Sequence, residues 1–316
     1  MAVQDYLRKR FFPHIWCAGC GHGTVLNGLL RSVEDLGLEK NEIVMVSGIG
    51  CSARISGYVD FHTLHTLHGR ALAFAMGVKM SRPDLTLLVP MGDGDALAIG
   101  GNHFIHAARR NIDMTAIILN NRIYGMTGGQ FSPLSGCEVK ATTAPFASID
   151  PAFDVVNVAA AAGATFVART TTYHVRELEK LLTKAIRHKG FSVVEVLSQC
   201  PTYFGRHNAE GSAVDMLQRF KEHTAPVGSK AFQVDADGRA DAADASAAGG
   251  AGDDARNGEL IPRGIFVDRE APEYCEEYLK LVDRVGEEGI PGETPTANSG
   301  AADAAGGEEG HDECGS

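Results

Sequence analysis

Short apolar runs alternate with helix-like runs along most of this chain, and that alternation limits the folds open to it. The strand-like runs are apolar almost throughout: 42–47, 85–90, 114–121, 164–169 and 191–198. The segments between them with helical character are 68–82, 96–110 and 173–189. Continuous apolar strands that alternate with helices are typical of a parallel sheet covered on both faces. We therefore predict an α/β fold with a doubly wound, mostly parallel sheet.

Polar residues follow two of these strands where each one ends. The sequence MGDGDA places Asp93 between two glycines after one strand, and the strand 114–121 ends in Asn120 and Asn121. The carboxyl ends of parallel strands form the ligand-binding edge of such a sheet. A carboxylate and an amide oxygen there can share one Mg²⁺ with a diphosphate. A plain glycine turn is the simpler reading of GDG alone. A dinucleotide site would require a G-x-G-x-x-G spacing, which this turn lacks.

Four of the seven cysteines lie where they can reach the same edge. Cys17 and Cys20 form a C-x2-C pair in an N-terminal loop, and Cys51 and Cys200 each follow a predicted strand. Four thiolates suit either Zn²⁺ or a [4Fe–4S] cluster, so the spacing leaves both open, together with four unrelated buried thiols. The other cysteines are assigned no role: Cys137, Cys275 and Cys314.

Five separated motifs resemble the beta subunits of 2-oxoacid:ferredoxin oxidoreductases, which bind thiamine diphosphate (ThDP). They are WCAGCGHG, GIGCSARISGY, HTLHGRALAFAMGVK, the run from GDGDA to QFSP, and CPTYFGRHN. The resemblance covers roughly residues 10–225 and, weakly, 260–288, and the motifs keep their order and spacing. YGMTGGQ and CPTYFGR look most like the 2-oxoglutarate members. Branched-chain 2-oxoacid enzymes are close competitors, and pyruvate enzymes are more distant.

The resemblance implies a set of binding residues. It implies [4Fe–4S] ligands at Cys17, Cys20, Cys51 and Cys200. It implies Mg²⁺ ligands at Asp93 and Asn121, with the backbone carbonyl of Ile123. It implies ThDP contacts at Ile49, Gly50, Cys51, Ser52, His68, Gly94, Asp95, Gly125 and Met126.

The same resemblance implies an activity and a set of partners. It implies oxidative decarboxylation of 2-oxoglutarate to succinyl-CoA, with coenzyme A as a substrate and electrons passed through the cluster to ferredoxin. We find no catalytic residue in this chain, because the activating Glu is expected on an alpha subunit. Gamma and delta subunits are further possible partners. Arg54, three residues after Cys51, is our candidate for binding the distal carboxylate of the substrate.

Composition divides the chain into an ordered body and acidic, low-complexity segments. The formal net charge is −11, and the acidic residues of 233–258 and 286–316 account for it. We predict a cofactor-binding domain at 1–225, a disordered insert at 226–259, a C-terminal docking segment at 260–288 and a disordered tail at 289–316. The body is near neutral, which gives no indication of nucleic-acid binding.

No apolar run approaches the length needed to cross a membrane, and no signal peptide is recognisable, so we expect a cytoplasmic protein. Two other classes of protein compete with the oxidoreductase interpretation. The first is a non-redox ThDP decarboxylase or synthase fragment, and the second is a zinc-stabilised α/β binding module without catalysis.

Overall fold

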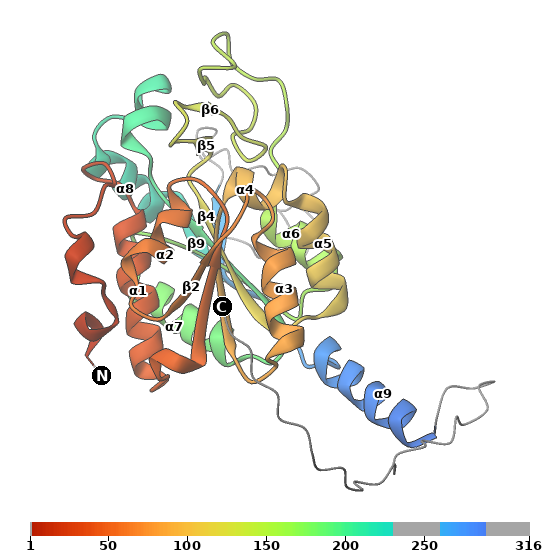
Figure 1. Cartoon of the computed structure of the whole chain (residues 1–316). Coiled ribbons are helices and arrows are strands. Elements are labelled where there is room, and N and C mark those ends of the chain that lie inside the picture. Colours follow the sequence, from red (N-terminus) through yellow and green to blue (C-terminus); the bar gives the residue numbers. More distant parts are fainter. Residues whose placement is uncertain (1, 230–259, 289–316) are drawn as a thin grey trace, which may run out of the picture. The chain divides into compact units, whose positions relative to one another are not determined.

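The computed structural model describes residues 2–229 and 260–288 (Figure 1). The chain divides into two units, residues 1–277 and 278–316, and the large sheet lies in the first. The strands of that sheet are β1 (Ile43–Ser47), β2 (His62–His65), β3 (Thr86–Gly92), β4 (Met114–Asn120), β7 (Phe166–Thr171), β8 (Phe191–Leu197), β9 (Thr224–Pro226) and β10 (Ile261–Asp268). A separate pair is formed by β5 (Ile123–Tyr124) and β6 (Gln130–Phe131).

The strand order is β2-β1-β3-β4-β8-β7-β10-β9. The first six strands in this order are parallel, whereas β10 pairs antiparallel with β7 and β9 pairs parallel with β10. This confirms the predicted mostly parallel sheet. The chain passes from β1 to β2 on one side and then to β3 on the other. The turns after β1 and β3 therefore border the point where strand order reverses, which is where such folds bind ligands.

Helices cover both faces of the sheet (Figure 1). One face packs against α1 (His22–Asp35), α2 (Ile55–Tyr58) and α7 (Val175–Arg187), and the other against α3 (Ala71–Ser81), α5 (Gly101–Arg110) and α6 (Val155–Ala161). The remaining α-helices of the described chain are α4 (Asp93–Leu97), α8 (Ala213–Glu222) and α9 (Tyr274–Glu288). Among the described residues, no helix combines the length and the apolar character that crossing a membrane requires.

The central strands are apolar throughout because each of their faces belongs to a different core. In β4, Ala116 and Ile118 pack in the cluster with α3, α5 and α6, whereas Ile117 and Leu119 pack in the cluster with α1 and α7. Side chains alternate across a strand, so a strand covered on both faces has no position left for a polar residue. This is why the apolar runs predicted these strands to within two residues at each end.

The structure corrects the single helix predicted at 96–110. The segment forms α4 and α5, and the chain leaves helical geometry at Ala98, where φ is −89° and ψ is −96°. A Cβ atom at Gly100 would lie only 2.2 Å from the carbonyl oxygen of Asp95. The close backbone approach at Gly100 is a tertiary feature, so helical periodicity along the sequence gave no sign of the break.

The segment from β10 onward contacts the body of the first unit through β10 and the residues that follow it. β10 pairs with β7, and Asn111 Nδ2 donates to the carbonyl oxygens of Ala271 and Pro272. Glu273 is 2% exposed and accepts from the backbone N–H of Asp113 at 3.0 Å. Helix α9 (Tyr274–Glu288) follows these residues. Residues 230–259 of the predicted insert and the whole predicted tail, from 289 onward, lie outside the described residues. The first residue of the predicted insert, Pro226, is the last residue of β9.

A buried ionic network lies behind the ends of β4, β7 and β8. Arg169 Nε donates to Glu195 Oε2 at 2.6 Å, and Asn120 Nδ2 donates to Glu195 Oε1 at 2.8 Å. Arg169 also pairs with Asp154 at 2.9 Å. Arg169 and Glu195 are 3% and 1% exposed. A buried carboxylate needs its cation, so this network fixes the strand ends that lead into the site.

We predict that replacing this buried cation destabilises the fold strongly. Arg169→Met removes the cation that pairs with the buried Glu195 carboxylate, and the free energy of unfolding should fall by about 3–5 kcal/mol. Chemical denaturation of the purified chain measures the change. Arg82→Met is the matched control, because Arg82 forms an exposed ion pair with Asp84. This variant should unfold at the same denaturant concentration as the wild type. Similar denaturation midpoints for both variants would contradict the prediction.

Candidate functional site

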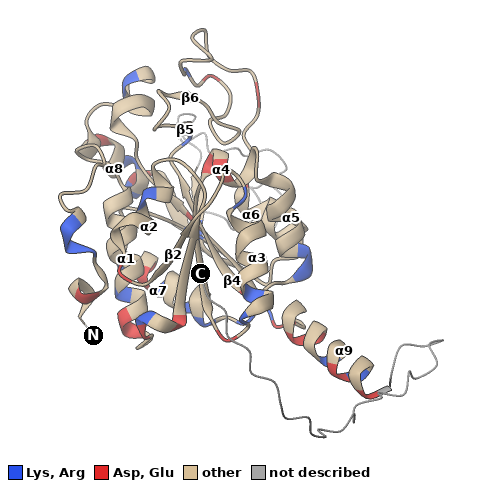
Figure 2. Cartoon of the chain, viewed as in Figure 1, with Lys and Arg blue, Asp and Glu red and all other residues tan. Residues whose placement is uncertain are grey.

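The turns after β1, β3 and β4 surround one cavity at the carboxyl edge of the sheet, which we call the cofactor cavity. In Figure 2 the acidic part of α4 lies at this edge, close to β5. Every residue that the sequence assigned to ThDP or Mg²⁺ lines it: Ile49, Gly50, Cys51, Ser52, His68, Asp93, Gly94, Asp95, Asn121, Ile123, Gly125 and Met126. The structure therefore brings together positions that are up to 77 residues apart in the chain.

Asp93 is the first residue of α4 and points a buried carboxylate into this region. It is 3% exposed, and its Oδ2 atom has no hydrogen-bond partner among the described residues. Burial raises the pKa of Asp93 to about 6, although hydrogen bonds from Ser132 and from the backbone of Gly94 and Ile123 oppose that rise. An unsatisfied buried carboxylate oxygen is a favourable ligand for a hard cation.

Asn121 follows β4 and lies beside Asp93 because β3 and β4 are paired, with Gly92 opposite Leu119. Its Oδ1 atom accepts from the backbone N–H of Ile123 at 3.3 Å, which forms a tight turn at the strand end. The turn starts from Asn120, which the buried Arg169–Glu195 pair holds in place. The predicted Mg²⁺ ligands are thus neighbours on a rigid base.

Asp95 and His68 hold two loops of the cavity together. Asp95 Oδ1 lies 2.7 Å from His68 Nδ1 and accepts from the backbone N–H of Gly69 at 2.6 Å. A longer contact of 3.5 Å joins it to the N–H of Ile49. Burial raises the pKa of Asp95, and these donors oppose the rise. One carboxylate therefore links the segments that follow β1 and β2 to α4.

A second cavity adjoins the first and is lined by all four predicted cluster ligands. We call it the cysteine cavity, and its lining includes Trp16, Cys17, Cys20, Cys51, Asn121, Gly125, Met126, Cys200 and Tyr203. A Cβ atom at Gly125 would lie 3.4 Å from Cys51 Sγ and 3.9 Å from Cys200 Sγ. Cys51, Asn121, Gly125 and Met126 line both cavities. The two predicted cofactor sites therefore share one wall.

Cys17 is exposed, whereas Cys20, Cys51 and Cys200 are partly buried, and N–H donors lie near two of them. Burial raises the pKa of Cys20 to about 12 and that of Cys51 to about 11, and neighbouring cysteines add to both shifts. Burial also raises the pKa of Cys200, against backbone donors at Phe204, Tyr203 and Thr202. Thiols in this setting stay protonated unless positively charged metal ions compensate their charge.

Within the described residues, no three His, Cys, Asp or Glu side chains form a group that could hold one metal ion. The four thiols instead line the wall of a cavity. Four thiols around a cavity are ligands that either a zinc ion or an iron–sulfur cluster can use.

Sequence reasoning missed several residues of both cavities. Tyr124 and Thr127 line the cofactor cavity, and the Tyr124 ring lies so close to Gly94 that a Cβ there would be 2.1 Å from it. Trp16 donates from Nε1 to the carbonyl oxygen of Cys51 at 2.8 Å, and the buried His22 lines the cofactor cavity. Gly94 of the GDG turn was the one available signal, because a glycine at a turn can indicate that another group lies close to the backbone there.

Arg54 is placed differently from the other predicted site residues. It lies in the turn Ser52–Arg54 after the cavity wall, and it is not among the residues that line either cavity. Its guanidinium carbon lies 5.8 Å from the centre of the Tyr58 ring. A role in substrate binding therefore stays a prediction for this residue.

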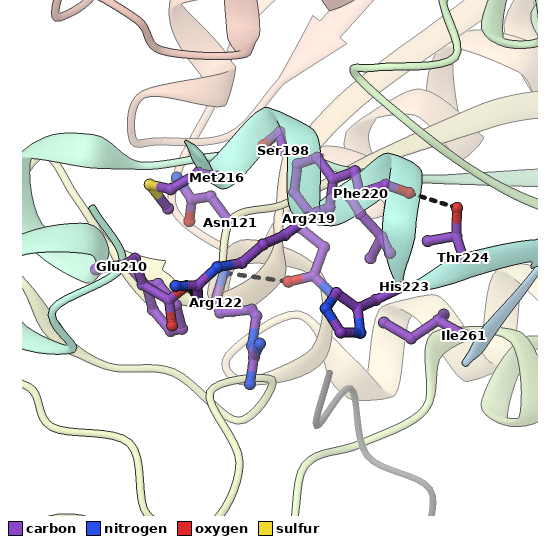
Figure 3. Close-up of a pocket in the computed structure, with 13 residues that line it drawn as sticks. Asn121, Arg122, Ser198, Glu210, Met216, Arg219, Phe220, His223, Thr224 and Ile261 are labelled. Carbon is purple, nitrogen blue, oxygen red and sulfur yellow. Dashed lines mark hydrogen bonds and ion pairs between the residues drawn. The ribbon is translucent and has the colours of Figure 1, made fainter. Parts of the chain in front are cut away.

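A third cavity lies on the other side of Asn121, between α8 and the ends of β4 and β8 (Figure 3). Its labelled lining includes Asn121, Arg122, Ser198, Glu210, Met216, Arg219, Phe220, His223, Thr224 and Ile261. Ser198 is 3% exposed, and its hydroxyl has no hydrogen-bond partner among the described residues. Asn121 lines all three cavities, so its position depends on packing on several sides.

Comparison with known proteins agrees with this geometry. Residues 48–196 match the family described as thiamine pyrophosphate enzyme, C-terminal TPP binding domain. The chain is 46% identical over 283 residues to 2-oxoglutarate synthase subunit KorB of Methanocaldococcus jannaschii, covering 90% of this chain and 98% of that protein. It is 52% identical over 219 residues to the KorB subunit of Archaeoglobus fulgidus, covering 69% and 80%.

A solved structure is also similar, the 2-oxoglutarate:ferredoxin oxidoreductase from Magnetococcus marinus with 2-oxoglutarate, coenzyme A and succinyl-CoA bound. The TM-score is 0.76 at 35% identity, over 90% of this chain and 91% of that one. Fold, cavity and matches together define a thiamine diphosphate-binding domain of the α/β type. Within that class, the chain belongs to the family of 2-oxoglutarate synthase subunits KorB, the beta subunits of 2-oxoacid:ferredoxin oxidoreductases.

We predict that Asp93→Asn stabilises the chain when no metal or cofactor is bound. Well below its ordinary pKa of 3.8, the carboxyl is protonated in the folded and unfolded chain alike. As the pH rises from about 4 to the folded value of about 6, the unfolded chain releases this proton while the folded chain keeps it, so the folded chain loses stability over that range. The neutral amide avoids this, which amounts to roughly 3 kcal/mol at pH 7.

Thermal or chemical unfolding at pH 7 and pH 4 measures this effect. The variant should be more stable than the wild type at pH 7, and most of that difference should be gone at pH 4. Added Mg²⁺ and ThDP should raise the unfolding temperature of the wild type only. A variant that is less stable than the wild type at pH 7 would show that the carboxylate is already compensated.

Proposed function

We propose that this chain is the ThDP-binding subunit of a 2-oxoglutarate:ferredoxin oxidoreductase, which converts 2-oxoglutarate oxidatively to succinyl-CoA. The observation that carries the proposal is that the cofactor cavity and the cysteine cavity share Cys51, Asn121, Gly125 and Met126. A site that joins a ThDP pocket to four thiols suits a reaction that combines decarboxylation with electron transfer. The names of the KorB relatives and of the solved enzyme from Magnetococcus marinus support this choice of substrate and coenzyme A.

In this proposal, Asp93 and Asn121 bind Mg²⁺ through side-chain oxygens, and Ile123 binds it through its carbonyl oxygen. The unpaired Oδ2 atom of Asp93 and the tight turn at Asn121 fit that role. ThDP, when bound, supplies the carbanion chemistry that decarboxylates a 2-oxo acid. The chain anchors the diphosphate through the metal, orders the surrounding loops through Asp95, and keeps this part of the site buried.

Cys17, Cys20, Cys51 and Cys200 hold a [4Fe–4S] cluster in the proposed enzyme. The arrangement of the thiols around a cavity and the backbone donors near Cys200 support a cluster, because N–H groups stabilise ligating sulfurs. Cys137 is exposed and Cys275 lies buried in a different core, so neither belongs to this group. The electrons leave through the cluster to ferredoxin.

A partner chain completes the active site. The acidic residues that line the cofactor cavity are Asp93 and Asp95, and no Glu of the described chain lines it. The Glu that activates ThDP, and the other half of the cofactor pocket, are therefore assigned to an alpha subunit. Gamma and delta subunits are possible further members of the assembly.

We predict that the co-expressed alpha–beta complex, purified without oxygen, is brown and contains about four irons per beta chain. Cys51→Ser and Cys200→Ser should lose the iron and the visible absorption that dithionite bleaches. Cys137→Ser is the matched control and should keep both, since Cys137 lies outside the cysteine cavity. A colourless wild-type complex with one zinc per chain would contradict the assignment and support a zinc-stabilised module.

Arg54 provides a test of substrate choice. If its guanidinium binds the distal carboxylate of 2-oxoglutarate, Arg54→Gln should raise KM for 2-oxoglutarate by about tenfold or more. KM for a branched-chain 2-oxo acid should stay near the wild-type value, because that substrate has no second carboxylate. Steady-state assays of the complex with a viologen dye measure both. Equal changes for both substrates would remove Arg54 from the substrate site.

A further inference from the structure

His22 lies at the boundary between the cofactor cavity and the cysteine cavity. It is the first residue of α1, it is 1% exposed, and its ring lines the cofactor cavity. Its Nδ1 atom lies 3.2 Å from the sulfur of Cys20, which lines the cysteine cavity. One buried imidazole thus contacts both parts of the site.

The chemistry of a cluster ligand fixes the direction of this hydrogen bond. A thiolate bound to iron carries no hydrogen, so the contact is attractive only when Nδ1 carries the proton and donates it. This holds for a neutral ring and for a protonated one, since Nδ1 carries a proton in the required tautomer and in the cation alike. The backbone N–H of His22 also donates to Cys20. The sulfur of Cys20 therefore has two donors from one residue.

The surroundings of His22 hold the ring in place. Its centre lies 6.0 Å from that of the Trp16 ring, and Trp16 is itself fixed by its hydrogen bond to the Cys51 carbonyl. The backbone N–H of Gly21 donates to Gln199 next to Cys200. Water cannot readily replace the imidazole donor, because the ring is almost fully buried.

We propose that His22 tunes the cluster by donating a hydrogen bond from Nδ1 to Cys20, which raises the reduction potential of the cluster. The inference rests on the proposed function, in which the four cysteines hold a [4Fe–4S] cluster. Reduction adds one electron and no proton to the cluster, so the sulfurs become more negative. A fixed donor stabilises the reduced form more than the oxidised form.

The side-chain donor differs from the donors at Cys200. Those donors are backbone N–H groups of Thr202, Tyr203 and Phe204, which remain whatever side chains stand there. The imidazole of His22 can be removed by one substitution that leaves every cysteine in place. This makes its contribution to the potential separable from cluster binding.

The test compares the alpha–beta complex carrying wild-type His22, His22→Phe or His22→Asn. The midpoint potential of the cluster is measured by a redox titration followed by electron paramagnetic resonance, with iron content determined for each sample. His22→Phe keeps a ring without a donor and should shift the equilibrium about tenfold toward the oxidised cluster, which is about 59 mV for one electron. His22→Asn keeps an N–H donor at the δ position and should stay close to the wild type.

Each outcome separates the inference from the proposed function. A wild-type complex without iron would overturn the proposed function itself. Full iron content with an unchanged potential in His22→Phe would overturn the inference alone. Equal shifts in both variants would also overturn it, because they would show an effect of packing and not of the donor.

A measurement on the wild type covers the case in which His22→Phe fails to assemble. Complex labelled with ¹⁵N-histidine is reduced and examined by pulsed electron paramagnetic resonance. A ¹⁵N coupling to the cluster that disappears in His22→Asn supports the hydrogen bond. The absence of any such coupling in the wild type would overturn the inference.

Discussion

The parallel pairing of β1, β3, β4 and β8 is the constraint on which the whole site depends. These four strands are adjacent in the sheet, so the segments that follow them must emerge side by side at one edge. The segment after β1 supplies Cys51, that after β3 supplies Asp93, that after β4 supplies Asn121, and that after β8 supplies Cys200. The cofactor cavity and the cysteine cavity then share a wall as a direct result of strand order. The covering helices of both faces hold this order through two separate cores.

The site concentrates buried groups that are poorly compensated within the described chain. Asp93 has an unpaired carboxylate oxygen, and burial raises the pKa values of Cys20, Cys51 and Cys200. The Asp93 carboxylate opposes folding near pH 7 until a cation binds, whereas the thiols stay neutral there and lose their protons only when a metal binds them. The contrast with Arg169 and Glu195 is informative, because that buried pair is satisfied internally. The buried charges that support the site are thus paired within the chain, whereas Asp93 Oδ2 in the proposed metal site has no hydrogen-bond partner among the described residues.

Sequence alone predicted the features that follow from short-range patterns. The apolar runs gave the parallel strands, and the positions of Asp93 and Asn121 at two strand ends gave the shared cavity. It did not predict Tyr124, Trp16 or His22, because their roles arise from packing between segments that are distant in the chain. The break between α4 and α5 has the same origin, since it depends on the approach of Gly100 to Asp95. Closeness in sequence also misleads, because Arg54 lies near Cys51 in the chain yet lines neither of the two adjoining cavities.

The shared wall has a consequence for how the two proposed cofactors influence one another. Cys51 lies in a segment that Asp95 fastens through Ile49, and Asp95 in turn contacts His68 on the far side of the cofactor cavity. Any movement of this segment would also move Cys51, a proposed cluster ligand. Cys20 and His22 lie next to the same region, at the start of α1. The backbone N–H of Gly21, just before α1, donates to the carbonyl oxygen of Gln199. In the proposed enzyme, these contacts would link the segment that carries Cys51 to the loop that carries His68, so that changes at the ThDP pocket reach a proposed cluster ligand through this chain.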